Sequence, residues 1–495
     1  MVISLKNCED AYKDLDFDKE DFIYYTSPFV SQIGLAEELS LYKNYPQKLS
    51  IAFIIKQILK YYVRLLLFVV SYLVETTAYS ISKIRNFNWD VKNNKTIFID
   101  CYVLSSSVMS EKPLLEGYFP GLADVLEKLG YRFIILPRFV WKKNPFESFS
   151  IFRRIKKDKN NFLSIYQLLN IFDLLNSFFV CLYYPFIIWK MLSKLPKNIT
   201  TKFLKIYFFK TLDGSNFLAT LRYHFGLRLA QKIEGRFKVI QWFENQPYDK
   251  SINFAFNRNQ EKSYVIGTQA FIWPSELLNY KISSFYGSKC LPSKILVNGP
   301  FYSAKPEFKY APSLRYKKLF EIGILNQSES PGKILCIFSY FPTANTLITS
   351  FLKTVFKESD NLLFKFHPTT DVTKLTSEIP FSMNIAGNSI YEIFSQVSFV
   401  IGASSGALVE AIACGVPVIV ISENGIIEYS YLPDFCKGVL WEDAYDFDSF
   451  ESAKIKLINV IREESEQRLN MIQRVRNEMF TEPSEERILE AFELN

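Results

Sequence analysis

Histidine is scarce in this chain of 495 residues, which has only His224 and His367. Metal sites in proteins need several clustered histidine, cysteine or carboxylate ligands. No acidic triplet with ligand spacing compensates for the shortage of histidine. The sequence therefore predicts no metal site, and we expect its chemistry to need neither a resident metal nor another cofactor.

Paired cysteines are also missing. The 7 cysteines are scattered, odd in number and without a CxxC spacing. This pattern excludes a disulfide framework and the common zinc and redox motifs, so we predict reduced thiols. Residues 1–20 are charged and lack the apolar run of a secretory signal. A cytoplasmic protein is expected, either free or peripheral at the inner face of the cytoplasmic membrane.

A strong charge of one sign is absent as well. The net charge of +7 comes from 58 basic and 51 acidic residues, which are dispersed along the chain. This mild excess is compatible with an anionic lipid or nucleotide, but no nucleic-acid recognition motif is present. With 48% hydrophobic residues, the chain has enough apolar side chains for two or three domains with large cores.

Uncharged apolar runs are too short to span a bilayer, which needs about 20 residues. One run, Leu65–Val74, lies in residues 51–84, where Lys56, Lys60 and Arg64 recur every four residues and share one helix face. We predict an amphipathic helix there. It either packs on the body of the protein or lies in a membrane surface.

The other run, Leu174–Trp189, belongs to the apolar segment 162–189, which follows a basic segment at 141–159. This order suits a membrane face with anionic lipid. A helical insertion buried against the N-terminal domain, preceded by a solvated basic loop, is the open alternative. The basic residues are Lys142, Lys143, Arg153, Arg154, Lys156, Lys157 and Lys159.

Polar clusters follow short apolar runs in the C-terminal half of the chain. Strand, polar turn, helix and strand is the pattern of a parallel sheet that is covered on both faces. The runs predicted as strands are Lys333–Phe338, Leu362–Phe366, Phe399–Ile401 and Val418–Ile421, with a helix at Ala407–Ala413 and a capping box formed by Ser389 and Glu392.

The polar clusters predict an anion site, because ligands bind outside the carboxyl ends of parallel strands. Ser404, Ser405 and Gly406 open a helix whose free N–H groups and dipole favour an anion, and glycine allows a phosphate to approach closely. Glu410, one turn further on, is placed to bind sugar hydroxyls. His367, held by Pro368 directly after its own strand, is expected to point into the same crevice.

The N-terminal half repeats the pattern, with polar residues after its predicted strands. Glu244 and Asn245 follow the apolar run at 237–243, and a helix with Lys250 and Arg258 comes next. Glu244 is a candidate general acid or base. A helix-capping or ion-paired carboxylate is the equally open alternative. The other predicted strands are Thr96–Val103, Tyr131–Pro137, Ser263–Gly267 and Lys294–Val297.

These patterns predict an α/β fold with two Rossmann-like domains around a central crevice. Residues 1–90 form a helical extension, and residues 91–305 form an acceptor domain with an apolar helical insertion at about 141–230. Residues 306–480 form the donor domain, and residues 481–495 a final helix. The polar, basic stretch 301–332, which contains three prolines, is predicted to be the linker.

Two doubly wound halves with a nucleotide site in the second resemble the glycosyltransferase B (GT-B) architecture. The stretch from Glu410 to Ile419, EAIACGVPVI, is similar to the donor-site helix and turn of that superfamily, whose glutamate holds ribose hydroxyls. Phe366-His367-Pro368 and Ser404-Ser405 resemble the HP and SS motifs of bacterial enzymes that use cytidine nucleotides. Those are polysialyltransferases, Kdo transferases and teichoic-acid glycerophosphotransferases, in which the His and Ser side chains contact the donor phosphate.

A second resemblance covers the N-terminal half. Trp242–Gln246 with Lys250, then Gly267–Gln269 and Val297–Pro300, resemble a group of bacterial surface-polysaccharide biosynthesis proteins. The two resemblances leave the first 90 residues outside. Many relatives have an aromatic residue and a histidine where this chain has Thr268 and Phe271, so either the base or the reaction differs here.

The resemblance implies a metal-independent enzyme that transfers a sugar from a cytidine-nucleotide donor, of the CMP-Kdo or CMP-nonulosonate type, to a growing surface polysaccharide or glycolipid. Glu244 and His367 would be catalytic. Asn245, Lys250, Arg258 and Gln269 would lie on the acceptor side or behind it. The donor would contact His367, Pro368, Ser404, Ser405, Gly406, Glu410 and Ser339.

Two alternatives stay open. The first is an enzyme of the same fold that uses a uridine-nucleotide sugar, either as a transferase or as a 2-epimerase. The second is a catalytically inactive scaffold for glycan assembly. Binding of CMP or CDP rather than UDP would distinguish the first alternative from the cytidine enzyme.

Overall fold

The structure of the protein is a computed structural model in which the chain divides into two compact units. The N-terminal unit comprises Met1–Gln269 and Leu277–Leu296, and the C-terminal unit comprises Ala270–Glu276 and Val297–Asn495. The described residues are 4–15, 22–32, 34–41, 50–82, 84, 96–109, 114–140, 144–156, 162–259, 261–277, 279–280, 288–303, 306–325, 332–357, 361–368, 370, 372–379, 381–387, 389–423, 429–463 and 465–494.

The first sheet has six strands in the order β2-β1-β3-β4-β5-β6. β1 pairs in parallel with β2 and β3, and β3 pairs in parallel with β4. The central strands are almost wholly buried, which explains their apolar runs. The strands are β1 (Thr96–Leu104), β2 (Arg132–Val140), β3 (Phe237–Trp242), β4 (Ser263–Gln269), β5 (Lys294–Val297) and β6 (Phe308–Tyr310).

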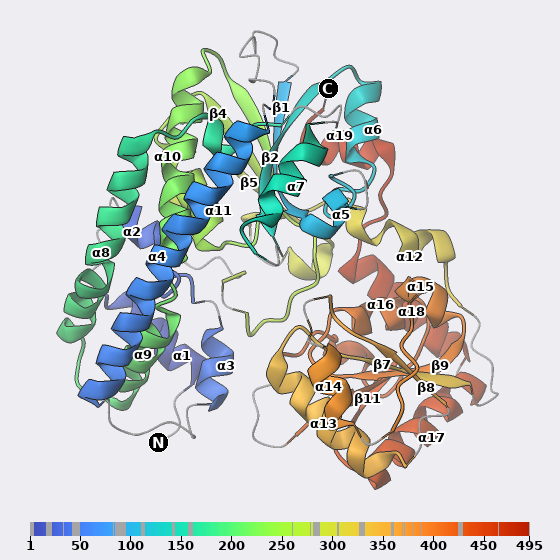
Figure 1. Ribbon diagram of the computed structural model, residues 1–495. Coiled ribbons are helices and arrows are strands. Elements are labelled where there is room, and N and C mark those ends of the chain that lie inside the picture. The colour runs from blue at the N-terminus through green and yellow to red at the C-terminus, as the bar shows by residue number, and fades with distance from the viewer. Residues whose placement is uncertain are drawn as a thin grey trace. The chain divides into compact units, whose positions relative to one another are not determined.

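Helices pack around this sheet, and several long ones lie beside it (Figure 1). Phe98, Val239 and Val265 of the strands pack with Phe225 and Ile252 of the helices in one core cluster. The helices are α1 (Leu5–Lys13), α2 (Phe22–Thr26), α3 (Leu35–Leu41), α4 (Ile51–Ile81), α5 (Ser105–Met109), α6 (Leu122–Lys128), α7 (Glu147–Ile155), α8 (Ile171–Lys194), α9 (Ile199–Thr211), α10 (Asn216–Lys232) and α11 (Pro247–Asn257).

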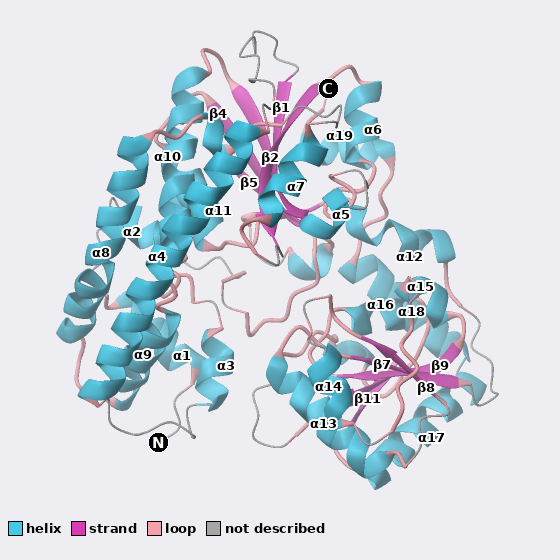
Figure 2. Cartoon of the chain, viewed as in Figure 1, coloured by secondary structure: helices cyan, strands magenta, loops and turns pink. Residues whose placement is uncertain are grey.

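The second sheet has five parallel strands in the order β11-β10-β9-β7-β8, with helices around it (Figure 2). The strands are β7 (Lys333–Ile337), β8 (Leu362–Lys365), β9 (Val397–Gly402), β10 (Val418–Ile421) and β11 (Trp441–Ala444). The helices are α12 (Lys317–Ile322), α13 (Pro342–Val355), α14 (Val372–Glu378), α15 (Ile390–Phe394), α16 (Ala407–Ala413), α17 (Phe447–Glu463), α18 (Ser465–Met479) and α19 (Glu485–Phe492).

Both sheets have the same doubly wound topology. In each, the second strand of the sheet lies outside the first, and the third, fourth and fifth continue on the other side. The strand order therefore reverses between β1 and β3 in the first sheet and between β7 and β9 in the second. This topology confirms the predicted α/β class with two Rossmann-like domains. It also marks where ligands bind in such sheets, at the carboxyl ends of the strands that flank the reversal.

Two local predictions are wrong. Part of the predicted linker is packed structure, because Leu314, Tyr316 and Leu319 are buried and the hydroxyl of Ser313 donates to the carbonyl oxygen of Asn298 at 3.0 Å. This stretch includes a 3₁₀ turn, η6 (Leu314–Tyr316), and α12. The capping box is absent, since the side chain at the start of α15 makes no capping hydrogen bond.

Candidate functional site

The strand register of the second sheet brings three predicted site residues to one edge. Ile337 of β7 is aligned with Lys365 of β8 and with Gly402 of β9. Ser339, His367 and Ser404 each lie two residues beyond these aligned positions. Because neighbouring strands are about 4.8 Å apart, the aligned positions of β8 and β9 are about 10 Å apart, with β7 between them.

Hydrogen bonds connect the ends of the three strands. The hydroxyl of buried Ser339 donates to the carbonyl oxygen of Ser404 at 2.7 Å. On the other side, Thr370 donates from its hydroxyl to the carbonyl oxygen of Ser339 at 3.4 Å and from its backbone N–H to that of His367 at 2.9 Å. The Ser339 hydroxyl proton is engaged with the Ser404 backbone. Ser339 therefore positions the turn after β9 and does not offer this proton to the nucleotide-sugar donor.

Ser404 has a strained backbone, with a φ of 47°. A non-glycine residue in this left-handed region costs about 1–2 kcal/mol, and such strain is often found at functional sites. Ser404 and the next residue, Ser405, are both half-buried, just before the start of α16.

Glycine is required at position 402, before the turn at Ser404, but not at position 406, after this turn. A Cβ on Gly402 would lie 2.9 Å from the carbonyl oxygen of Ile337, whereas a Cβ on Gly406 would meet only ordinary contacts at 3.5 Å and beyond. Gly406 also has a helical φ of −62°. The expectation that Gly406 allows a phosphate to approach the main chain closely stays a prediction. Gly402 permits the close approach of β7 and β9.

His367 is half-buried, and its ring lies edge-on to that of Tyr340 with centroids 5.4 Å apart. Burial lowers the pKa of His367 below its ordinary value of 6.5, and the positive charge of Arg315 lowers this pKa further. The imidazole is therefore neutral at pH 7 in the free protein. Pro368 is exposed, while the next residue, Thr369, lies outside the described residues.

Glu410 lies in the first turn of α16 and accepts a hydrogen bond from the hydroxyl of Tyr391. Burial raises the pKa of Glu410, and the charge of Arg315 opposes that rise. The carboxylate is held by Tyr391 before any ligand arrives. This arrangement is compatible with the predicted role of binding sugar hydroxyls.

Arg315 is a candidate site residue that the sequence analysis missed. It is exposed in η6, and its charge acts on the pKa of both His367 and Glu410. A guanidinium near an imidazole and a short helix start is what a phosphate group would need. No sequence pattern pointed to Arg315, because the burial of its neighbours Leu314 and Tyr316 is visible only in the structure.

Glu244 lies just beyond β3, beside the strand reversal of the first sheet. Its carboxylate accepts hydrogen bonds from the indole N–H of Trp242 at 2.8 Å and from the side-chain amide of Gln246 at 2.6 Å. The ring of Trp242 is in turn packed edge-on against Tyr118, with centroids 4.8 Å apart. Two donors therefore fix the half-buried Glu244 carboxylate in one position.

A buried ionic network holds the turn that carries Glu244. Asp249 accepts hydrogen bonds from the backbone N–H of Glu244 at 2.9 Å and from Arg138 at 2.5 Å. Arg138 also donates to the carbonyl oxygen of Trp242 at 2.6 Å. Asp100, which pairs with Arg222 at 2.7 Å, completes the network. The signal for it was a charged residue inside each of the apolar runs 96–103 and 131–140, which the sequence analysis did not use.

Asn245 is strained and buried, with a φ of 53°. Neither its amide oxygen nor its amide nitrogen has a hydrogen-bond partner among the described residues, and the same holds for the side-chain oxygen of Gln269 at the end of β4. A buried amide with no partner is costly unless water or a ligand satisfies it. These two residues are thus compatible with an acceptor-side site.

Lys250 and Arg258 occupy different positions along α11. Lys250 is fully buried, donates to the hydroxyl of Ser31 at 3.2 Å, and has a pKa that burial lowers to about 7. Because it is buried, Lys250 can influence an acceptor site only through the residues that cover it. Arg258 is at the far end of α11, about 15 Å along the helix from its start. There it donates to the hydroxyl of Tyr223 at 2.6 Å.

Comparison with known proteins gives distant structural likenesses. No family model matches the sequence, and no curated protein matches it. A glycosyltransferase from Rickettsia africae matches with a TM-score of 0.40 and 10% identity, over 78% of this chain and 95% of that one. A UDP-GlcNAc 2-epimerase from Neisseria meningitidis bound to UDP-GlcNAc matches with a TM-score of 0.41 and 10% identity, over 81% and 100%.

The wall teichoic acid polymerase TagF also matches, with a TM-score of 0.37 and 9% identity, over 90% of this chain and 97% of that one. Likenesses this weak do not by themselves establish a shared function. The functional argument therefore depends on the strand order, the strand register and the side chains of the site.

Proposed function

We propose that the protein is a glycosyltransferase of the GT-B type that uses a nucleotide sugar. The observation that carries the proposal is the alignment of Ser339, His367 and Ser404 at the strand reversal of the second sheet. Such a reversal is where nucleotides bind in doubly wound sheets. The HP and SS motifs at this edge favour a cytidine-nucleotide donor, of the CMP-Kdo or CMP-nonulosonate type.

The donor phosphate would be held by side chains of the C-terminal unit. Hydroxyls of Ser404 and Ser405, the imidazole of His367 and the guanidinium of Arg315 supply donors and charge, and Glu410 binds sugar hydroxyls. α16 has only 7 residues, so its dipole is a minor contribution. Stabilising the negative charge of the leaving phosphate lowers the barrier to transfer.

In the transfer step, the oxygen of an acceptor hydroxyl forms a bond to the anomeric carbon of the donor sugar. The bond between that carbon and the phosphate oxygen breaks, and its electron pair leaves with the nucleotide. The acceptor proton passes to a carboxylate, for which Glu244 is our candidate. Because the guanidinium, the imidazole and the hydroxyls would stabilise the negative charge of the leaving phosphate, we propose that no metal is needed. The acceptor would be a growing surface polysaccharide or glycolipid.

Calorimetric titration of the full chain with CMP, CDP, UMP and UDP in EDTA tests this proposal. We expect CMP or CDP to bind at micromolar concentrations and the uridine nucleotides to bind at least tenfold more weakly. Preference for UDP would indicate a uridine-nucleotide donor at the same site instead of a cytidine-nucleotide donor. Binding of none of the four would contradict a nucleotide-sugar enzyme, and binding that appears only with added divalent metal would contradict metal independence.

A further inference from the structure

An extended apolar face covers two long helices of the N-terminal unit. The exposed hydrophobic residues of α4 recur every three or four residues, so they form one stripe along the helix. Their exposed fractions run from 47% to 77%. The residues are Ile51, Ile55, Leu59, Val63, Leu66, Leu67, Val70, Leu73 and Ile81.

α8 carries a matching stripe of exposed, mainly aromatic residues. Phe172 is 74% exposed, Tyr183 is 61% exposed and Phe186 is 60% exposed. In a folded soluble protein, large aromatic side chains are normally buried. The remaining members of the stripe are Ile171, Leu175, Phe179 and Trp189.

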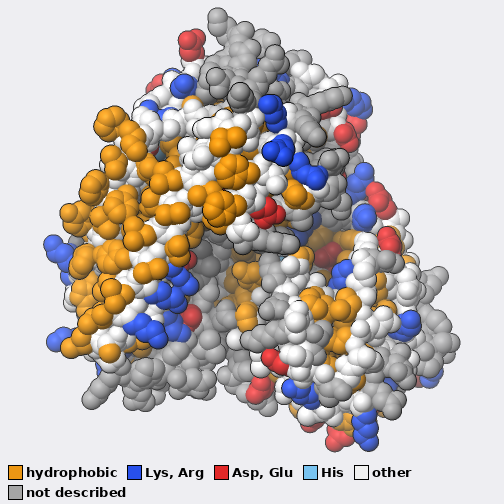
Figure 3. All heavy atoms as spheres, in the orientation of Figure 1, with side chains coloured by type: hydrophobic (Ala, Val, Ile, Leu, Met, Phe, Trp, Pro, Cys, Tyr) orange, Lys and Arg blue, Asp and Glu red, His pale blue; other side chains and the backbone are white. Residues whose placement is uncertain are grey.

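The two helices lie side by side and antiparallel, so their stripes form one surface. The hydroxyl of Tyr61 donates to the carbonyl oxygen of Cys181 at 2.6 Å, and that of Tyr62 donates to the carbonyl oxygen of Leu182 at 3.0 Å. Further along α4, the carboxylate of Glu75 accepts from Tyr166, which lies just before α8. Figure 3 shows the hydrophobic side chains gathered over α4 and α8.

The opposite side of α8 is fixed to the protein. Tyr184 forms a hydrogen bond of 2.6 Å with the hydroxyl of Ser27, and Asp173 pairs with Arg228 at 2.5 Å. By length and composition alone, α8 is the one helix among the described residues that could cross a membrane. A helix that packs along its length against one protein face is better suited to lie in the plane of a membrane surface.

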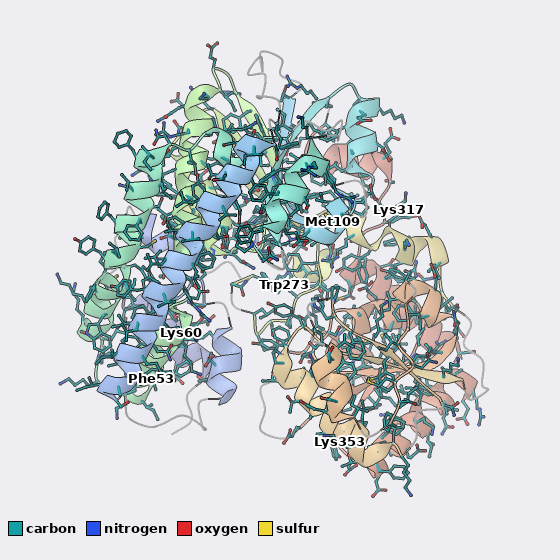
Figure 4. The ribbon with its side chains drawn as sticks, in the orientation of Figure 1. Phe53, Lys60, Met109, Trp273, Lys317 and Lys353 are labelled. Atoms are coloured by element: carbon teal, nitrogen blue, oxygen red, sulfur yellow. The ribbon has the colours of Figure 1, made fainter. Side chains whose placement is uncertain are left out.

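The charges next to the apolar face are basic. Lys56 and Lys60 border the stripe on α4, and Lys190 and Lys194 lie at the C-terminal end of α8. Figure 4 labels Phe53 and Lys60 on α4. Phe53 and Trp189 both contact the ring of Phe209, so the two basic pairs are at the same end of the helix pair.

Acidic side chains are nearly missing from this face. Among the described residues of α4 and α8, the acids are Glu75 and Asp173, and both accept hydrogen bonds from neighbouring side chains. Basic residues on α7 and directly after it, at the other end of α4, include Arg153 and Lys156. Lys142, Lys143, Lys157 and Lys159 of the predicted basic segment lie outside the described residues.

We propose that this α4–α8 face docks the protein on an anionic lipid bilayer, with both helices lying in the interface. The apolar and aromatic side chains would enter the boundary between headgroups and acyl chains, and the lysines would contact anionic headgroups. An apolar stripe of this length, with basic residues at its borders and no exposed acid on α4 or α8, is complementary to an anionic bilayer surface. The docking surface belongs to the N-terminal unit and does not depend on the proposed donor site.

An introduced fluorophore tests insertion without disturbing packing. All seven native cysteines are buried, so a thiol-reactive, polarity-sensitive dye would label Phe179→Cys selectively. Ile455→Cys on α17 is the matched control, because Ile455 is 57% exposed and Phe179 is 54% exposed. With vesicles of phosphatidylcholine and phosphatidylglycerol, we expect a blue shift for the dye at 179 and none at 455. No shift at 179 would overturn the proposal.

Cosedimentation with the same vesicles measures binding directly. Replacing Leu67 and Phe179 by Glu is expected to lower the bound fraction at least about tenfold, and Ile455→Glu should bind as the wild type does. Lys56→Glu with Lys60→Glu should lower binding to anionic vesicles by at least about tenfold. Equal binding by the wild type and the Leu67/Phe179 variant would overturn the proposal. So would a wild-type protein that forms a dimer through this face and ignores vesicles.

Discussion

Ser404 shows how one residue can combine backbone strain with a candidate ligand contact. Its φ of 47° is unfavourable for serine, so Ser404→Gly should raise the free energy of unfolding by about 0.5 kcal/mol. The same change removes the hydroxyl and should weaken nucleotide binding. Urea unfolding and calorimetry measure the two effects.

Ser405→Gly is the control for Ser404, because Ser405 is not among the residues with positive φ. Glycine at position 405 should lower the free energy of unfolding by about 0.5–1 kcal/mol. If both glycine variants were less stable than the wild type, the strain at Ser404 would not be released by glycine and the argument would be wrong.

The pH dependence of nucleotide binding should depend on His367. Burial and Arg315 hold its pKa below 6.5 in the free protein, and a bound phosphate favours the charged imidazole. Binding therefore takes up a proton, and affinity should rise as pH falls from 8 toward the free-state pKa and level off below it. Calorimetry between pH 5.5 and 8 measures this rise, to which the phosphate's own titration contributes equally in all variants.

His367→Asn should remove the part of the pH dependence that the imidazole causes. His224→Asn is the control, since His224 interacts with Asn176 and Asp173 of the N-terminal unit. Identical pH profiles for the wild type and His367→Asn would show that the imidazole does not contact the phosphate.

At the scale of elements, the β3–α11 turn is held by the buried network around Arg138. Replacing Arg138 by Met would leave the Asp249 carboxylate buried without its guanidinium partner. The free energy of unfolding should fall by about 3 kcal/mol or more. Arg153→Met, at an exposed site on α7, should change it by no more than about 0.5 kcal/mol. Equal losses for the two variants in urea unfolding would contradict this role.

Lys250 of α11 is expected to lower the stability of the fold in a pH-dependent way. Its pKa is about 7 when folded and about 10.4 when unfolded, so the unfolded state binds more protons between these values. The loss of stability that burial of the charged ammonium causes is therefore complete below pH 7, and it disappears as pH rises toward 10. Lys250→Met should raise the free energy of unfolding by about 2–4 kcal/mol at pH 7 and by less at pH 9.

Lys232→Met is the control for Lys250, because Lys232 is exposed near the end of α10. It should leave the stability almost unchanged at both pH values. A Lys250→Met protein that is less stable than the wild type at pH 7 would mean that the ammonium makes interactions that outweigh its burial.

The elements that could be predicted from the sequence are those with strong local patterns. α16, β5 and β10 have the predicted bounds, because short apolar runs between glycine, proline and serine define them. Arg315 could not be found in this way, since its stretch is polar and rich in proline and packs only through contacts with distant residues. The Asp100–Arg138–Asp249 network is likewise formed by residues from separate elements, with Arg138 and Asp249 111 positions apart.

At the scale of the whole molecule, the two sheets have one topology but different ends. The second sheet ends in serines, a histidine and a nearby guanidinium, whereas the first ends in a fixed carboxylate and buried amides. This division matches a donor site in one unit and an acceptor site in the other. The predicted crevice between the units, and the joint action of Glu244 and His367, remain predictions.

Calorimetric titration of CDP into Arg315→Gln and Lys317→Gln tests the donor site most directly. The two residues are near neighbours in the same segment, and Lys317 is exposed and labelled in Figure 4. If Arg315 holds the donor phosphate beside His367 and Glu410, Arg315→Gln should weaken CDP binding at least about tenfold, the loss expected for one charge-assisted contact. Lys317→Gln should bind like the wild type. Equal affinity for both variants and the wild type would contradict a phosphate site at this edge of the second sheet.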